Sequence, residues 1–176
     1  MAVYHLNTQE LCSFSSKLCA GDEVFLSGTV YTARDAAHKK IMQLINEGAP
    51  LPFEICGACI YYAGPTPSRP GMPIGSCGPT TSSRMDVFAP KLLDMGLCAM
   101  IGKGGRSEEV VNAIVRNGAT YFCSIGGAGA LAAMCIKKCE VVAFEELGCE
   151  SVKRLEFSEF PVYTAIDCRG GSLFSN

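Results

Sequence analysis

The chain has 176 residues, of which 48% are hydrophobic and 18% are charged, and its 15 basic and 17 acidic residues give a formal charge of −2. This composition is that of a globular protein with one core, so we expect a single domain over residues 1–176 and exclude disordered and fibrous classes. No dense Lys/Arg block is present, so no nucleic-acid partner is expected. The longest apolar run, residues 125–136, is too short to cross a bilayer, and residues 1–7 lack a signal-like pattern. We therefore expect no membrane association and a cytoplasmic location.

The first half of the chain predicts strands and one clear helix. Segment 3–6 is a short strand, 7–19 is helical or irregular, 20–22 is a turn, 23–31 is an alternating strand, and 55–62 is a further strand. Between the last two, residues 35–46 have apolar positions at helical spacing, and Gly48 with nearby prolines ends the helix. His38 lies on this helix, where a packing or capping role is commoner than a catalytic one.

The second half alternates helices and strands after a long loop. Residues 64–79 hold five prolines and four glycines and form an irregular loop, a type that is often functional. Three units follow: helix 82–95 with strand 97–101, helix 107–117 with strand 119–125, and helix 128–137 with strand 139–144. This alternation predicts an α/β fold of parallel strands with crossover helices. The tail, residues 152–173, has shorter strand-like pieces.

Eleven cysteines are present, an odd number that cannot be fully paired within the chain. Without a secretion signal they are expected to be reduced thiols. Cys56 and Cys59 form the one C-x-x-C, which lacks the second pair of a zinc ribbon, and Cys135 and Cys139 have no His nearby. We interpret them as small buried hydrophobic side chains and predict no metal site on this chain.

Residues 77–86, Cys-Gly-Pro-Thr-Thr-Ser-Ser-Arg-Met-Asp, combine a turn, hydroxyl caps and a cation. Gly78 and Pro79 stop the preceding segment, and the Thr and Ser residues after them are capable helix N-caps. Free N–H groups at a helix N-terminus favour an anion, and Arg84 adds a bidentate fork for a carboxylate. The loop therefore predicts an anionic substrate.

Two further cations lie in similar contexts. Arg34 follows a predicted strand, although Asp35 is available as its ion-pair partner. Lys103, in Ile101-Gly-Lys-Gly-Gly105, lies at an expected strand-to-helix junction, where ligands gather in α/β proteins. This motif lacks the spacing of a phosphate-binding P-loop.

Several motifs together resemble the β subunit, or C-terminal domain, of iron–sulfur class I fumarate hydratases and the related L-tartrate dehydratases. They are residues 26–38, 62–65, 78–86, 101–105, 124–127 and 160–161, all in family order. The resemblance implies a three-layer β/β/α fold of the swivelling-domain type. It also implies a hydro-lyase that hydrates fumarate reversibly to L-malate and is active only as a hetero-oligomer. A [4Fe–4S] cluster, whose cysteines match none of those present here, is implied on a separate α subunit.

The resemblance also assigns roles residue by residue. Thr80 falls on the position of the catalytic base, whereas Arg34, Arg84 and Lys103 fall on cations that bind substrate carboxylates, with Thr81 and Gly78 beside them. A threonine is a poor base unless nearby cations stabilise its alkoxide. Ser82 and Ser83 stand where many fumarases have Ala-Gly, so L-tartrate or another dicarboxylate remains an alternative substrate.

Two other classes of function remain as alternatives. Gly127-Ala-Gly129 follows a predicted strand, opens a helix and precedes Glu145 and Glu146 at the spacing of a dinucleotide fingerprint. The eleven cysteines also suit a non-enzymatic thiol or scaffold protein. With two histidines and neither beside a candidate nucleophile, a Cys–His hydrolase is poorly supported.

Overall fold

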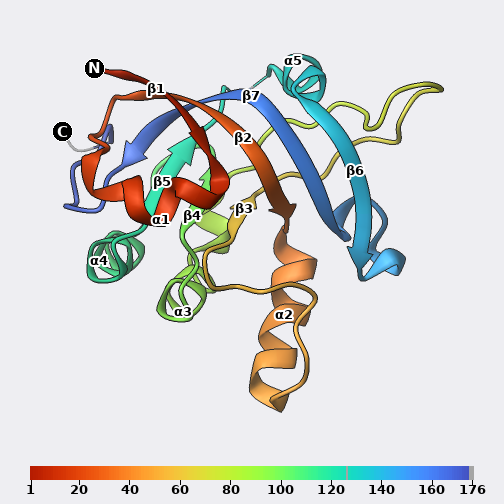
Figure 1. Ribbon diagram of the computed structural model, residues 1–176. Coiled ribbons are helices and arrows are strands. Elements are labelled where there is room, and N and C mark those ends of the chain that lie inside the picture. The colour runs from red at the N-terminus through yellow and green to blue at the C-terminus, as the bar shows by residue number, and fades with distance from the viewer. Residues whose placement is uncertain (126, 175–176) are drawn as a thin grey trace.

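The structure is a computed structural model that describes residues 1–125 and 127–174. In this part of the chain, seven strands form one mixed sheet in the order β1-β2-β3-β4-β5-β7-β6, and β7 pairs with β2 as well as with β5. The second pairing closes β2, β3, β4, β5 and β7 into a five-stranded barrel. Figure 1 shows α2, α3 and α4 together on one side of the barrel and α5 at the opposite end.

The strands are β1 (Val3–Asn7), β2 (Glu23–Thr32), β3 (Cys59–Tyr61), β4 (Ala99–Gly102), β5 (Thr120–Cys123), β6 (Ile136–Ala143) and β7 (Val152–Ile166). The α-helices are α1 (Leu11–Phe14), α2 (Asp35–Glu47), α3 (Ala89–Asp94), α4 (Glu108–Asn117) and α5 (Gly129–Met134). Short 3₁₀ helices lie at Thr8–Glu10, Ser15–Lys17, Ser82–Met85 and Glu145–Glu150. None of the helices in the described ranges has the length and apolar content that a bilayer span requires.

Strands β1 to β5 are parallel, as the alternation of strands and helices predicts. The two expected helices at 35–46 and 107–117 are confirmed as α2 and α4, and each ends at a glycine in the left-handed region, Gly48 at φ 64° and Gly118 at φ 62°. Ser107 caps α4 by accepting a hydrogen bond from the Val110 amide. The α/β class is thus confirmed, and the structure shows a five-stranded mixed barrel. The three-layer β/β/α architecture stays a prediction.

Three expected elements differ from the structure. The helix expected over 82–95 is a 3₁₀ helix at Ser82–Met85 followed by α3, because Pro90 lacks an amide hydrogen and is tolerated only in the first turn of a helix. The last unit is not parallel: β6 runs antiparallel to β7 instead of joining the parallel strands. The tail, expected as short pieces, is the fifteen-residue strand β7, because it pairs with β2, β5 and β6.

Side-chain alternation along the barrel strands gives the protein two cores. Tyr61 and Phe122 belong to one core, while their neighbours Ile60 and Tyr121 belong to the second, which includes the buried faces of α2, α3 and α4. Within the first core Phe157 and Phe160 stack with ring centroids 4.1 Å apart, and Tyr61 meets Phe160 edge-on at 5.5 Å. These rings fill the barrel interior on the inner side of β7, the strand that carries Phe157 and Phe160.

Replacing Phe160 by alanine should destabilise the fold strongly. The ring is 1% exposed and contacts two other aromatic rings, so its loss leaves a cavity costing about 3–5 kcal/mol in free energy of unfolding. Urea denaturation of the variant measures this loss. Val87→Ala is the control, because Val87 is 79% exposed and its truncation should change stability by less than about 0.5 kcal/mol.

Candidate active site

The carboxyl ends of the four parallel barrel strands lie side by side. Thr32 of β2 is in register with Tyr61 of β3, which is in register with Ile101 of β4, and Gly102 is in register with Cys123 of β5. The segments that leave these strands therefore meet at one edge of the barrel, where ligands commonly bind in α/β proteins. Arg34 and Lys103 are the cations on these segments.

The 77–86 loop lies across this edge and is fixed by its backbone. The Thr80 amide donates to the Tyr62 carbonyl at 2.7 Å, and Thr81 forms a parallel bridge with Lys103. Ser82 then makes two bonds with Lys103: its amide donates to the Lys103 carbonyl, and its Oγ accepts from the Lys103 amide, both at 3.0 Å. These bonds place Thr80, which is half-buried, and Thr81, which is exposed, beside the strand end that carries Lys103.

The helix N-terminus expected after this loop is only partly present. A 3₁₀ helix of four residues follows Thr81, which stands at its N-cap position and makes no side-chain capping bond. One 3₁₀ turn provides fewer aligned amides than an α-helix. The positive charge available to an anion here therefore comes mainly from the arginines and the lysine.

Arg84 is held by a carboxylate of the protein. Its Nε and Nη2 donate to the two oxygens of Asp35 at 3.1 and 2.6 Å, a bidentate ion pair. Burial alone would raise the pKa of Asp35, but the bonds from Arg84 outweigh it and hold that pKa below its usual value. By sequence Asp35 is an available partner for Arg34, but in the structure its carboxylate binds Arg84 of the 77–86 loop.

Arg34 has a different partner and a tighter surrounding. Its Nη2 lies 3.5 Å from Oε1 of Glu150, and its Nε is buried without a hydrogen-bond partner among the described residues. Gly64 is required next to it, since a Cβ at that position would lie 2.6 Å from Nη1 of Arg34. The Arg34 guanidinium therefore has N–H donors, Nε among them, that are not bonded to a protein carboxylate in the described residues.

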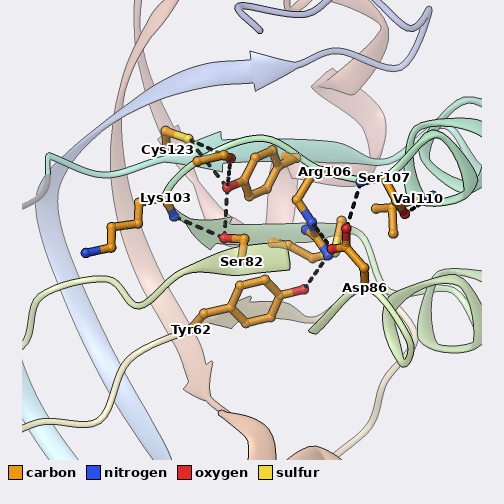
Figure 2. Close-up of polar contacts among 11 residues, drawn as sticks. Tyr62, Ser82, Asp86, Lys103, Arg106, Ser107, Val110 and Cys123 are labelled. Atoms are coloured by element: carbon orange, nitrogen blue, oxygen red, sulfur yellow. Dashed lines mark hydrogen bonds and ion pairs between the residues drawn. The ribbon is translucent and has the colours of Figure 1, made fainter. Parts of the chain in front are cut away.

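Lys103 is exposed and makes no ion pair with any residue in the described ranges. Figure 2 shows its side chain extending away from the buried residues behind it. Gly104 follows at φ 80°, a conformation that favours glycine. Lys103 is therefore available to bind an anion.

A buried polar network supports the loop from behind, and sequence reasoning missed it. The Arg106 side chain is fully buried, and its Nε donates to Asp86 at 2.7 Å while the other Asp86 oxygen accepts from the Ser107 amide at 2.7 Å. The guanidinium also lies over the rings of Tyr62 and Tyr121. Figure 2 shows Arg106 with Asp86 and Tyr62. No local pattern marks Asp86 and Arg106 as partners, because they are twenty residues apart.

Gly78 lies where the loop meets the start of α5. The Cys77 amide donates to the Gly129 carbonyl at 2.9 Å, and a Cβ on Gly78 would lie 3.5 Å from the Gly129 Cα. The dinucleotide interpretation of Gly127 and Gly129 is not supported, because α5 has six residues and leads to the antiparallel strand β6 instead of a neighbouring parallel strand. Gly126 lies outside the described residues.

The cysteines form no metal centre in the structure. Among the described residues, no group of three or more His, Cys, Asp or Glu side chains is arranged to hold a metal ion, and all eleven cysteines are free thiols. Cys59 is buried and Cys56 is exposed. The residues present thus do not fit an iron–sulfur cluster within this chain.

His38 is buried beneath the site and has a packing role, as expected. Its Nδ1 lies 2.8 Å from the Arg34 carbonyl, which can only accept, so Nδ1 carries the proton and Nε2 is a bare acceptor without a partner among the described residues. The ring stacks on Phe88 and meets Tyr62 edge-on. Burial lowers the pKa of His38 to about 4.

These features define an α/β barrel protein with cations gathered at the carboxyl edge of its parallel strands. Residues 2–176 match the family described as Fumarase C-terminus, and the chain belongs to that family. It is 39% identical over 168 residues to the anaerobic class I fumarate hydratase of Escherichia coli, covering 94% of this chain and 31% of that protein. The match to fumarate hydratase 2 of Leishmania major is 39% over 162 residues, covering 91% of this chain and 28% of the relative.

A relative of different length has the same region. A Methanocaldococcus jannaschii protein named as an L(+)-tartrate dehydratase β subunit is 37% identical over 164 residues, covering 90% of this chain and 84% of that protein. The chain thus spans about a third of the fumarate hydratases it matches and most of this subunit.

His38 should make the stability of the fold depend on pH. An unfolded histidine has a pKa of about 6.5, so between about pH 6.5 and 4 the unfolded chain binds a proton that the native chain does not. Stability is therefore lost as the pH falls through this window, by about 3 kcal/mol in total. Urea denaturation at pH 7 and pH 4.5 should show a smaller loss for His38→Gln than for the natural chain. Equal pH dependence for His38→Gln and the natural chain would contradict the prediction.

Proposed function

We propose that this chain is the β subunit of a hydro-lyase that reversibly hydrates fumarate to L-malate. Its relatives are fumarate hydratases, which are hydro-lyases, and this supports the class of reaction. The proposal is supported by the backbone arrangement, because the segments that carry Arg34 and Lys103 and the 77–86 loop with Thr80 and Arg84 lie at one edge of the barrel. A four-carbon substrate with two carboxylates needs several cations, and this edge provides them.

In this proposal the cations bind the substrate and Thr80 moves a proton. Lys103 and Arg34 bind substrate carboxylates through N–H donors that protein carboxylates do not fully use. Arg84 adds its positive charge while it stays paired with Asp35. Thr81 and Gly78 line the same loop and contact the substrate. In the direction of dehydration, Thr80 Oγ1 accepts the proton from the carbon next to a carboxylate, and the negative charge that develops spreads onto that carboxylate beside the cations. The same cations lower the free energy of the threonine alkoxide.

We also propose that the second half of the chemistry lies on an α subunit. The fumarate hydratases that the chain matches are about three times as long as the matched region, and the relative of similar length is named a β subunit. The proposed α subunit holds a [4Fe–4S] cluster, which acts as the Lewis acid for the hydroxyl group. Hetero-oligomer formation and a cytoplasmic setting are parts of the same proposal.

L-tartrate is the second candidate substrate. The Methanocaldococcus jannaschii relative supports it by name. Ser82 does not bear on the choice through direct contact, because it is buried and its Oγ is engaged by the Lys103 amide and the Tyr121 hydroxyl. Ser83 is exposed and is the residue of this pair that a substrate hydroxyl can reach. A non-enzymatic thiol or scaffold role would be favoured if the complex showed no turnover of either substrate.

Thr80→Ala should abolish most turnover and leave the complex assembled. Loss of a positioned general base typically lowers kcat by about 10²–10⁴-fold. The measurement is the loss of fumarate absorbance by the anaerobically purified complex with its α subunit. Ser68→Ala is the control, because it removes a hydroxyl at an exposed position of the neighbouring 64–79 loop, to which no role in the site is assigned. A Thr80→Ala complex with natural kcat would exclude Thr80 as the base.

An apolar surface beside the site supports the proposed partner. Ile125, Leu131 and Met134 are 54%, 66% and 64% exposed and line one groove with Pro161. This surface is continuous with the site, because α5 begins against Cys77 and Gly78. A partner that completes the site must lie against this edge, so we expect the α subunit to cover the groove.

Leu131→Asp should weaken the complex. A charge in a buried apolar contact has no partner and loses the burial of the leucine, so the dissociation constant should rise at least about tenfold. Analytical ultracentrifugation of the purified subunits measures it. Val87→Asp places the same charge at another exposed apolar position, between Ser82–Met85 and α3, and should leave the dissociation constant unchanged. Equal effects of the two variants would contradict the assignment of the groove.

A further inference from the structure

Glu150 connects two distant parts of the chain at the site. It ends the 3₁₀ helix between β6 and β7, and its carboxylate faces the start of α2. Oε2 accepts the Ala36 amide hydrogen at 2.9 Å, and Oε1 lies 3.5 Å from Arg34 Nη2. The Arg34 and Glu150 side chains are 24% and 23% exposed, so water screens this contact less than it would a surface ion pair.

The N-terminus of α2 requires an acceptor that its own residues do not provide. Arg34 is the N-cap residue, and a guanidinium has donors only, so no side chain caps this end from within. The Ala36 amide instead finds its acceptor on Glu150, more than a hundred residues away. The positive helix end and the charge of Arg34 both favour a carboxylate at this point.

Other contacts confine Arg34 on its remaining sides. Its carbonyl accepts from the His38 amide at 2.9 Å and from His38 Nδ1 at 2.8 Å, which fixes the backbone. Gly64 lies against Nη1, where a Cβ would clash. Among residues 1–125 and 127–174, Glu150 is the one carboxylate within ion-pair distance of the Arg34 guanidinium.

We propose that Glu150 is a positioning residue that holds the Arg34 guanidinium in the orientation that binds a substrate carboxylate. This inference rests on the proposed function, which places the carboxylate on Arg34. Arg84 differs, because Asp35 engages both its Nε and its Nη2 at short distances. The contact of Glu150 at 3.5 Å fixes one side of Arg34 and leaves donors for a second carboxylate.

The test is the binding of a dicarboxylate to a Glu150→Gln complex. The Ala36 amide and Arg34 lie against different oxygens of Glu150, so glutamine replaces one of these acceptors by an amide NH₂ that cannot accept, and it removes the negative charge. We expect the dissociation constant of succinate, which cannot be hydrated, to rise about tenfold by calorimetry. The KM for fumarate should rise similarly and kcat should fall by a smaller factor, since Arg34 already binds a carboxylate before negative charge develops on the substrate.

Two further variants separate positioning from folding. Glu150→Asp keeps the charge and both oxygens and should bind succinate with intermediate affinity, and it decides the question if the glutamine variant does not assemble. Glu146→Gln is the matched control: Glu146 lies in the same segment, Glu145–Glu150, before the kink at Gly148, and pairs with Lys40 of α2 at 2.6 Å. It removes an ion pair between the same two elements and should leave succinate binding unchanged.

The outcomes distinguish this inference from the proposed function. Natural affinity for succinate in Glu150→Gln, or tighter binding because a competing carboxylate is gone, would overturn the positioning role. Equal weakening by Glu146→Gln would overturn it as well, since the effect would then be structural. A natural complex that binds succinate without hydrating fumarate would remove the proposed reaction and leave the role of Glu150 standing.

Discussion

The antiparallel pairing of β7 with both β2 and β5 is the constraint on which the rest of the structure depends. Strand β7 pairs with β2 along most of its length and then with β5, so the first and last of the four parallel strands are joined through it. Without this closure the parallel strands would form an open sheet. With it, their carboxyl ends form a ring, and the segments carrying Arg34 and Lys103 face one space. The stacked rings of Phe157 and Phe160, two residues of β7, stabilise this closure from the barrel interior.

Each cation of the site has a different electrostatic surrounding. Arg84 is bound bidentately by Asp35, Arg34 has one long contact with Glu150, and Lys103 is exposed. Resident carboxylates keep the arginines in place when no substrate is bound, and they limit the repulsion between neighbouring cations. In the proposed function, a substrate carboxylate would add to this arranged set of charges, which would lower the cost of ordering on binding.

The loop that carries Thr80 depends on buried polar groups behind it. Asp86 binds both Arg106 and the first amide before α4, and thus joins the end of the loop to the helix that follows β4. A buried ion pair contributes little net stability, but removing either partner leaves an uncompensated charge. This pair therefore fixes where the loop lies more than it stabilises the fold as a whole.

The sequence by itself determined the elements that local chemistry controls. Apolar spacing and terminal glycines predicted α2 and α4, and the alternation of helices and strands predicted the parallel strands up to β5. The resemblance to known motifs located the loop around Thr80, but the roles it assigns stay predictions.

Tertiary structure decided what depends on contacts between distant segments. The tertiary pairings make β7 one long strand and close the barrel. They also place Asp35 against Arg84 and Glu150 against Arg34. Caps and periodicity act within a few residues and can be read locally. The partner of a strand edge or of a buried charge lies across the fold, so its identity follows only from how the chain packs.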